Sequence, residues 1–177
     1  MEAPHQWFAM RATYKREFVA QEYLQSKGID VFIPLRREIK VIKGIKRKVT
    51  VPAISSLVFV YAQKEHIQQV KLGVDYLQYL TRKLEGKNIP IIVPHDQMEL
   101  FKKVMDDDTI DKIYFAPGEI NLVEGTKVKV HGGPLDGYQG ILMKQKGRRN
   151  KQFFLDVEGV IIVNPELKSY DLIEIVK

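Results

Sequence analysis

Basic side chains that could bind a polyanion are concentrated in the N-terminal part of this 177-residue chain. Residues 1–105 contain 18 Lys/Arg against 10 Asp/Glu, a net charge of +8, whereas residues 106–177 contain 10 against 12, a net charge of −2. This excess is typical of nucleic-acid binding, and an ordinary solvated surface is the alternative that charge alone leaves open. The basic residues form two groups: Arg11, Lys15 and Arg16, and the segment with Arg36, Arg37, Lys40, Lys43, Lys46, Arg47 and Lys48 around the single acid Glu38.

Residues with catalytic or metal-binding chemistry do not form a recognisable pattern. The chain has no cysteine, which excludes disulfides and thiolate zinc sites. Its four histidines are scattered without the spacing of a nucleophile or metal motif. Three consecutive aspartates at 106–108 indicate a solvated linker, because neighbours on a flexible segment do not converge on one ion. We therefore expect no enzymatic activity, no metal and no cofactor.

The stretch GTKVKVHGGPLDGYQGILMK (125–144) could be read as a phosphate cradle because it holds five glycines and a proline. A cradle requires the loop to lead into a helix, whose N-terminal amides bind the anion. Here ILMK is followed by Gln145-Lys146-Gly147 and a further strand-like run. The glycines therefore predict a tight strand–turn–strand bend, where Gly133, Gly137 and Gly140 permit positive φ or close backbone approach.

The elements that position these groups change type along the chain. Helices alternate with strands up to residue 105, an acidic segment with Pro117-Gly118 then predicts a linker over 106–119, and residues 120–177 show short β-branched runs without helical period. We predict an α+β domain at 1–105, with an antiparallel sheet flanked by helices, and a small all-β barrel at 120–177. The predicted helices are 15–27, 64–73 and 94–105; the predicted strands are 7–12, 29–34, 56–62, 76–80, 89–93, 127–130, 140–144, 153–157, 160–163 and 172–176, with a hairpin over 37–51 that turns at Lys43-Gly44.

The sequence also bears on location. No window approaches the roughly 18 apolar residues of a membrane-spanning helix. MEAPHQWFAM lacks the basic and apolar regions of a secretory signal. We expect a cytoplasmic monomer without a membrane partner.

The glycine-rich stretch resembles a KOW motif, a module found in ribosomal proteins and in transcription elongation factors of the NusG class. The matching positions are Gly125, Val128, Val130, Gly133, Pro134, Leu135, Gly137 and Gly140. Trp7-Phe8-Ala9, Glu17, Phe32-Ile33-Pro34 and SLVFV (56–60) resemble a NusG N-terminal domain. The resemblance covers almost the whole chain and is closest to the specialised RfaH and UpxY types. Ser55-Ser56-Leu57 departs from the Pro-Gly-Tyr or Pro-Asn-Tyr usual in the family.

The resemblance implies that the N-terminal domain binds the clamp region of RNA polymerase through an apolar depression. The residues at the matching positions are Trp7, Ile54, Leu57 and Phe59, with Gln68 and Gln69 reaching the other side of the polymerase cleft. Strand alternation places Leu57, Phe59 and Tyr61 on one face and Val58 and Val60 on the other, and we expect the first face to be the exposed docking face. The alternatives are that Trp7 and Phe59 are core residues and that the glutamines lie on an ordinary solvated helix face.

The resemblance also implies nucleic-acid contacts. Arg11, Lys15 and Arg16 match a strand–helix junction that meets non-template DNA at the upstream fork, where phosphate contacts give affinity without sequence reading. For Lys43, Lys46 and Arg47 in the hairpin, DNA contact and lysine protection of an exposed strand edge both remain open. For the basic loop KQKGRRNK (144–151), contact with RNA or a ribosomal protein and simple solvation of a hairpin tip both remain open.

These features together predict a transcription factor that rides on RNA polymerase and suppresses pausing or termination, serving particular operons of the polysaccharide type. The KOW barrel would recruit Rho or a small-subunit ribosomal protein. Because turn glycines and β-branched runs oppose helix, we expect a β-barrel here and not a helical hairpin. The alternative is a ribosome-associated RNA-binding KOW protein, which predicts a positive barrel, whereas residues 106–177 carry a net −2.

Overall fold

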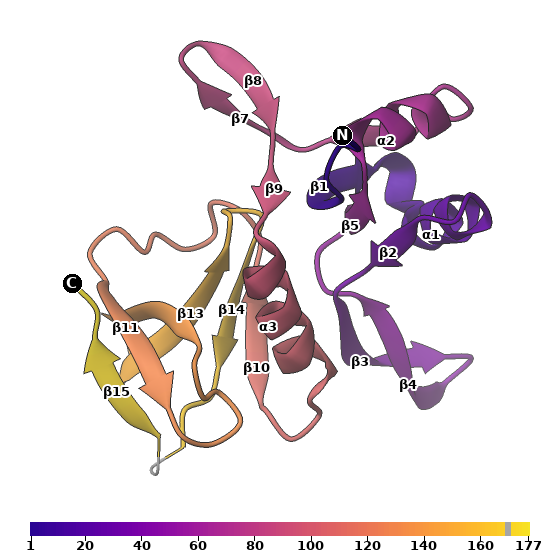
Figure 1. Ribbon diagram of the computed structural model, residues 1–177. Coiled ribbons are helices and arrows are strands. Elements are labelled where there is room, and N and C mark those ends of the chain that lie inside the picture. Colours follow the sequence, from indigo (N-terminus) through magenta and orange to yellow (C-terminus); the bar gives the residue numbers. More distant parts are fainter. Residues whose placement is uncertain (169–170) are drawn as a thin grey trace. The chain divides into compact units, whose positions relative to one another are not determined.

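The computed structural model describes residues 1–168 and 171–177, which form two compact units, 1–95 and 96–177 (Figure 1). The first unit is built on an antiparallel sheet with the order β2-β5-β1-β6, and β9 also pairs with β1. Apolar β-branched and aromatic residues dominate these strands, as expected for a buried sheet. The strands are β1 (Gln6–Ala12), β2 (Asp30–Phe32), β5 (Leu57–Ala62), β6 (Leu77–Tyr79) and β9 (Ile92–Val93).

Two helices contribute to the core on one face of this sheet. α1 (Glu17–Ser26) buries Ala20 and Leu24, and α2 (Lys64–Lys71) buries Ile67 and Val70. α1 ends where Gly28 adopts φ +73°, a conformation that permits its N–H to donate to a carbonyl of the last helical turn. The helix turns Phe18 and Val19 to solvent. The core of this face is formed by Phe8, Met10, Ala12, Ala20, Leu24, Ile29, Ile33, Val58, Val60, Ala62, Ile67, Val70, Tyr76 and Leu77.

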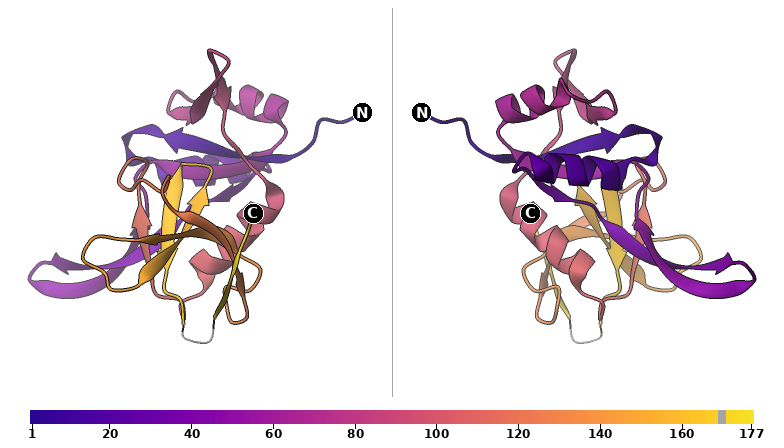
Figure 2. Two further views of the ribbon diagram at one scale, coloured as in Figure 1. Left: turned by 90° about the vertical axis from the view of Figure 1, so that its left-hand side faces the viewer. Right: turned by 90° about the vertical axis from the view of Figure 1, so that its right-hand side faces the viewer.

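Two hairpins form separate two-stranded sheets in the first unit. The predicted hairpin is β3 (Leu35–Ile42) with β4 (Ile45–Pro52), and Figure 2 shows it extending well away from the sheet of its own unit. Lys43 and Gly44 have φ of 49° and 78°, the two positive values of a type I′ turn. The second hairpin, β7 (Thr81–Leu84) with β8 (Lys87–Pro90), turns in the same way at Glu85-Gly86 and was not predicted from the sequence.

The second unit combines α3 (His95–Asp106), from Asp96 onward, with a six-stranded antiparallel sheet in the order β10-β14-β13-β12-β11-β15. The five strands predicted beyond residue 120 are confirmed. The fold is thus a mixed one, with antiparallel sheets and few helices. The strands are β10 (Lys112–Phe115), β11 (Thr126–His131), β12 (Gln139–Lys144), β13 (Lys151–Val157), β14 (Ile161–Pro165) and β15 (Leu172–Ile175).

The division of the chain differs from the predicted boundaries of 1–105, 106–119 and 120–177. β10 lies inside the predicted linker, yet it pairs with β14 over four residues and is part of the sheet. α3 was expected in the N-terminal domain, whereas it groups with the C-terminal strands. Two hydrogen bonds join α3 to this unit: the Gln97 side chain donates to the Asp156 carbonyl at 2.9 Å, and the Tyr138 hydroxyl donates to the Leu100 carbonyl. No helix in the described part of the chain is long and apolar enough to cross a membrane.

Candidate functional site

The strand pairing of β1 with β5 defines two faces of the N-terminal sheet. Trp7 lies opposite Tyr61, and Ala9 lies opposite Phe59. Since directly opposed residues share a face, these side chains and that of Leu57 stand on one side. Val58 and Val60 belong to the core with the helices on the other side. The predicted alternation along LVFVY is therefore confirmed.

The sheet face of Leu57 and Phe59 was expected to be exposed, but the structure buries it. Leu57 is 3% exposed and Phe59 0%, and Trp7 is 5% exposed. β5 lies between β2 and β1, and side chains on both of its faces are buried. Ile54, in the preceding loop, is half-buried. Tyr61 is the partly exposed member of the face, and its ring lies 5.0 Å from that of Trp7 between centroids.

The loop that departs from the family pattern is held by a buried carboxylate. Ser56 has φ +67°, and its N–H donates to Glu17 Oε1 at 2.5 Å. Its carbonyl accepts from the N–H of Ala12 at 2.8 Å. Glu17 is a buried charged residue at the start of α1, and it thereby joins α1 to the segment that leads into β5. Sequence reasoning named Glu17 only through the resemblance and did not find this contact.

The structure brings Arg11, Lys15 and Arg16 to one exposed strand–helix junction, as the sequence predicted. Arg11 is the penultimate residue of β1, Lys15 closes a short 3₁₀ turn at Thr13–Lys15, and Arg16 precedes α1. Two aromatic residues that sequence reasoning missed complete the cluster. The Arg16 guanidinium lies 5.5 Å from the ring centroid of Tyr14 and 5.3 Å from that of Tyr76. Both distances are within the range of cation–π attraction.

The charges around this junction favour binding of an anion. Asp75 is the acid that pairs with Arg16, at a long N–O distance of 4.0 Å, and its side chain is almost fully exposed. Such an exposed pair contributes little and is easily replaced by another anion. Burial raises the pKa of Tyr76 above its ordinary value, so this hydroxyl stays neutral at physiological pH. The junction therefore presents cations and aromatic rings, and the buried acid beside it, Glu17, accepts a hydrogen bond from the Ser56 N–H.

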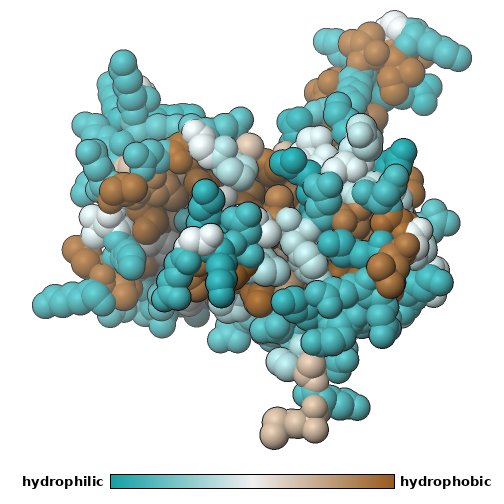
Figure 3. All heavy atoms as spheres, turned by 90° about the horizontal axis from the view of Figure 1, so that it is seen from above, coloured by the Kyte–Doolittle hydropathy of each residue, from teal (hydrophilic) through white to brown (hydrophobic). Residues whose placement is uncertain are grey.

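The β3–β4 hairpin mixes basic and apolar side chains on an exposed arm. Glu38 pairs with Arg36 at 3.0 Å and with Lys40 at 3.1 Å. Lys43 occupies the turn, and Lys46 and Arg47 alternate between the two faces of β4. Figure 3 shows the mixture on the arm that projects at the upper right. The exposed apolar side chains of the hairpin are Leu35, Ile39, Val41, Ile42 and Ile45.

Gln68 and Gln69 lie side by side on the solvent-exposed side of α2. Ile67 and Val70, which flank them in the sequence, are buried in the core. Helical periodicity thus fixes both glutamines outward, where a partner has access to them. Exposure agrees equally with the docking role and with an ordinary solvated helix face.

The glycine-rich motif forms a bend between β11 and β12. Gly137 has φ +83° and donates its N–H to the Val130 carbonyl at 2.8 Å. Gly140 permits close strand approach, because a Cβ there would lie 2.4 Å from the Phe154 carbonyl oxygen. The motif residues Val128, Val130 and Leu135 are buried. These positions build the turn, and a strand follows them instead of the helix that an anion cradle needs.

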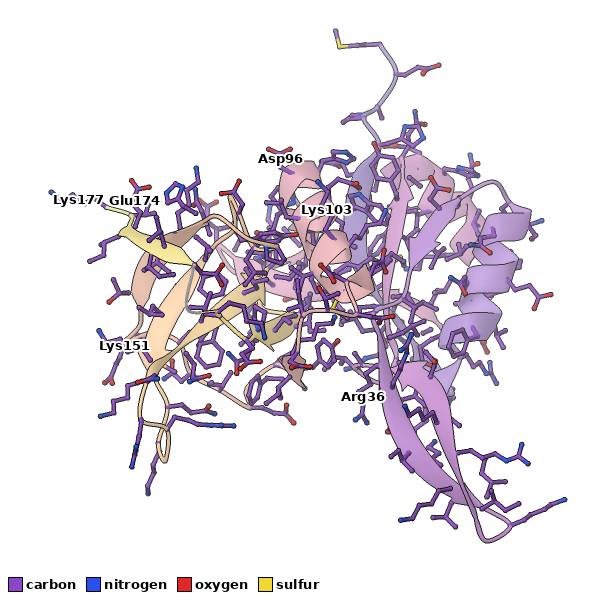
Figure 4. The ribbon with its side chains drawn as sticks, turned by 90° about the horizontal axis from the view of Figure 1, so that it is seen from below. Arg36, Asp96, Lys103, Lys151, Glu174 and Lys177 are labelled. Atoms are coloured by element: carbon purple, nitrogen blue, oxygen red, sulfur yellow. The ribbon has the colours of Figure 1, made fainter. Side chains whose placement is uncertain are left out.

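The basic loop between β12 and β13 is exposed. Figure 4 shows Lys151 at the start of β13 beside this loop, whose side chains extend away from the sheet. A groove of about 710 Å³ lies next to it. Its charged lining has both signs, which does not select a polyanion: Asp111, Lys112, Arg148, Lys151, Glu166 and Lys168.

Comparison with known proteins assigns the family. The family model described as "Transcription termination factor nusG" matches residues 5–102, more than half of the chain. The chain belongs to the NusG family. The NusG-family match covers most of the first unit and part of α3, and does not reach the C-terminal sheet.

Comparison with curated proteins found no match. Among solved structures, the chain is similar to NusG of Thermotoga maritima, at 15% identity, a TM-score of 0.49 and coverage of 98% of both chains. It is also similar to a chain of the MjSpt4:Spt5 complex, at 14% identity, a TM-score of 0.28 and coverage of 96% of both. These two scores are too low to support an argument, and the family assignment rests on the sequence match.

Proposed function

We propose that this NusG-family protein is a transcription elongation factor that travels with RNA polymerase and suppresses pausing or termination. One observation carries the proposal: the family match falls on the unit that holds the positive charge of the chain, with Arg11, Lys15 and Arg16 exposed at one junction. Residues 1–95 contain 16 Lys/Arg and 8 Asp/Glu, a net charge of +8. Such a surface favours a partner that presents nucleic acid.

Contact with polymerase is proposed at the sheet face of Trp7, Leu57 and Phe59, together with Ile54. Because these three side chains are buried, docking there requires the face to be uncovered first. Gln68 and Gln69, already exposed, would contact the opposite side of the cleft. A protein that binds both sides more tightly in the closed clamp shifts polymerase away from its paused state by differential affinity.

The C-terminal unit is proposed to act as a KOW module that recruits a second protein, Rho or a small-subunit ribosomal protein. Residues 96–177 contain 12 Lys/Arg and 14 Asp/Glu, a net charge of −2, which suits a protein partner better than RNA. This charge argues against the alternative of a ribosome-associated RNA-binding protein. The resemblance to RfaH and UpxY types supports a role at particular operons, of the polysaccharide type.

Because the chain lacks cysteine, one introduced cysteine gives a unique labelling position. The test uses the full chain with Gln68→Cys carrying a photo-crosslinker, added to elongation complexes assembled from purified bacterial RNA polymerase. We expect crosslinks to polymerase and shorter pauses in single-round transcription. Lys146→Cys, in the exposed loop of the other unit, is the matched control and should give few polymerase crosslinks. Absence of binding to elongation complexes, with co-sedimentation on ribosomal subunits, would support the ribosomal alternative.

A further inference from the structure

The segment between β1 and α1 holds two successive residues in a backbone conformation that L-residues rarely adopt. Tyr14 has φ 58° and ψ 34°, and Lys15 has φ 54°. Neither is the glycine or asparagine that usually occupies this region. Backbone strain of this kind persists where surrounding contacts over-determine it, and it gathers at functional sites.

Contacts from both sides fix this turn. The N–H and the hydroxyl of Thr13 both donate to the Tyr76 carbonyl, at 2.8 and 3.3 Å. On the preceding side, Ala12 donates to the Ser56 carbonyl at 2.8 Å, and Ser56 is itself held by Glu17. The strained turn is therefore anchored to the β5 entry and to the segment before β6. An anchored turn presents its side chains at a defined position.

The turn presents the aromatic side chain of Tyr14 to solvent. Tyr14 is 85% exposed. The Arg16 guanidinium lies near both the Tyr14 and the Tyr76 rings, and Arg11 and Lys15 are exposed on the same short segment. Asp75 makes a long contact with Arg16, and the neighbouring buried Glu17 accepts from the Ser56 N–H. An exposed ring beside a guanidinium, with two further cations on the same segment, is a combination with which proteins hold unpaired nucleotides.

We propose that Tyr14 is a stacking platform for one unpaired base of single-stranded nucleic acid, with Arg11, Lys15 and Arg16 on the adjacent phosphates. Every base has a π-face, so stacking tolerates any sequence, whereas bases inside a duplex have their faces covered and do not fit the platform. The inference deepens the proposed function and rests on it, because it names the ligand class of the same basic junction. Single-stranded DNA and RNA share this chemistry, and the experiment separates them.

The test measures fluorescence anisotropy of the full chain with labelled oligonucleotides of about 12 nucleotides, within the range of single-strand sites. The three ligands are oligothymidylate, its ribo counterpart and an abasic oligomer with the same phosphates. Tyr14→Asn removes the ring and tolerates the left-handed backbone, so it keeps the turn folded. We expect Tyr14→Asn to weaken thymidylate binding by roughly 5- to 150-fold, the equivalent of one stacked base, and Tyr14→Phe to retain it. Binding to the abasic oligomer should not change.

A second variant reports stacking directly. Trp7 is the single tryptophan of the chain and is buried, so Tyr14→Trp adds an exposed fluorophore. Thymidylate should quench it, and the abasic oligomer should not. Tighter binding of the deoxy or the ribo oligomer identifies whether Tyr14 stacks on DNA or RNA. A preference for the ribo oligomer would assign RNA, and not non-template DNA, as the ligand of this junction.

Two outcomes would overturn the stacking proposal and leave the proposed function distinguishable from it. If Tyr14→Asn binds thymidylate like the wild type while Arg11, Lys15 and Arg16 still determine affinity, the junction binds phosphates without stacking. If no oligonucleotide binds, the platform does not exist, and polymerase crosslinking through position 68 still tests the proposed function on its own. Circular dichroism and thermal melts of each variant verify that the fold is intact.

Discussion

Both units of the chain are built on antiparallel strands, but they differ in net charge and in the residues that distinguish them. Residues 1–95 carry a net charge of +8, a sheet that is apolar on both faces and cations exposed at a strained turn. Residues 96–177 carry −2, and their distinguishing residues are glycines that permit a tight bend. The charge difference is the same whether the first domain ends at residue 105, as predicted, or at residue 95, as observed, because residues 96–105 contain two basic and two acidic residues. We therefore expect nucleic-acid contacts in the first unit, whereas the glycines of the second unit build its turn between β11 and β12.

The largest expected effect concerns the buried sheet face of the first unit. Leu57→Asp places a carboxylate at a 3% exposed position, where it must be desolvated without a partner. We expect a loss of more than about 3 kcal/mol in the free energy of unfolding, measured by urea denaturation. Gln68→Asp, on the exposed side of α2, is the control and should change stability by less than about 0.5 kcal/mol. A stable Leu57→Asp protein would instead identify this face as exposed in solution and ready to dock.

The next effect tests whether the glycines of the second unit are architectural. A Cβ at Gly140 would lie 2.4 Å from the Phe154 carbonyl oxygen and 2.6 Å from a ring carbon of Phe153, so Gly140→Ala forces the strands apart. We expect destabilisation of about 3 kcal/mol by thermal or urea unfolding. At Gly44, in the turn of the β3–β4 hairpin, a Cβ would have no atom within 4 Å, so Gly44→Ala adds only the strain of a positive φ. It should lower the free energy of unfolding by about 1 kcal/mol. Equal losses would contradict the distinction.

The third effect compares the basic groups of the two units. Replacing Arg11, Lys15 and Arg16 together by Gln should lower the slope of log affinity against log salt by about two for single-stranded DNA, since each phosphate contact contributes roughly 0.7. The matched variant replaces Lys146, Arg148 and Arg149 in the loop of the second unit. Its slope should equal that of the wild type in the same anisotropy titrations. A reversal of the two results would place nucleic-acid binding in the C-terminal unit.

Sequence patterns predicted the elements well where the local signal was strong. The run of β-branched and aromatic residues located β5, and Lys43-Gly44 located the type I′ hairpin, because both signals depend on neighbouring residues. β10 was missed because KIYF is short and follows an acidic run, and it becomes a strand only through pairing with distant β14. α3 was assigned by chain order, whereas the long-range bonds of Gln97 and Tyr138 decide its unit.

The candidate site was less accessible from sequence. Alternation separates the two faces of β5 but does not say whether either is covered, so the burial of Leu57 and Phe59 came only from the structure. The cations of the strand–helix junction were found because charge is visible in the sequence. Tyr14 was not, because a tyrosine gives no local signal for positive φ, and contacts with Tyr76 and Ser56 hold its turn.

The smallest effect is a pH dependence in the second unit. Burial, and then the charge of Asp107, raise the pKa of Tyr138 to about 12, above the value of about 10 in an unfolded chain. The folded state therefore holds this proton more tightly, and its contribution to stability is complete below about pH 10 and is lost as pH rises toward 12. Tyr138→Phe removes this loss, along with the hydrogen bond to the Leu100 carbonyl.

Burial also raises the pKa of Tyr76 and Tyr79 in the first unit, so the wild type loses stability at high pH through both units. The difference between wild type and Tyr138→Phe isolates the second unit, because the other two tyrosines are present in both proteins. Urea denaturation at about pH 9 and pH 11 should show the mutant less stable at the lower pH and the gap narrowing at the higher, by at most about 1.4 kcal/mol per pH unit. A gap that stays constant with pH would mean that the Tyr138 hydroxyl ionises as freely in the folded unit as in the unfolded chain, and that its contact with α3 is open to water.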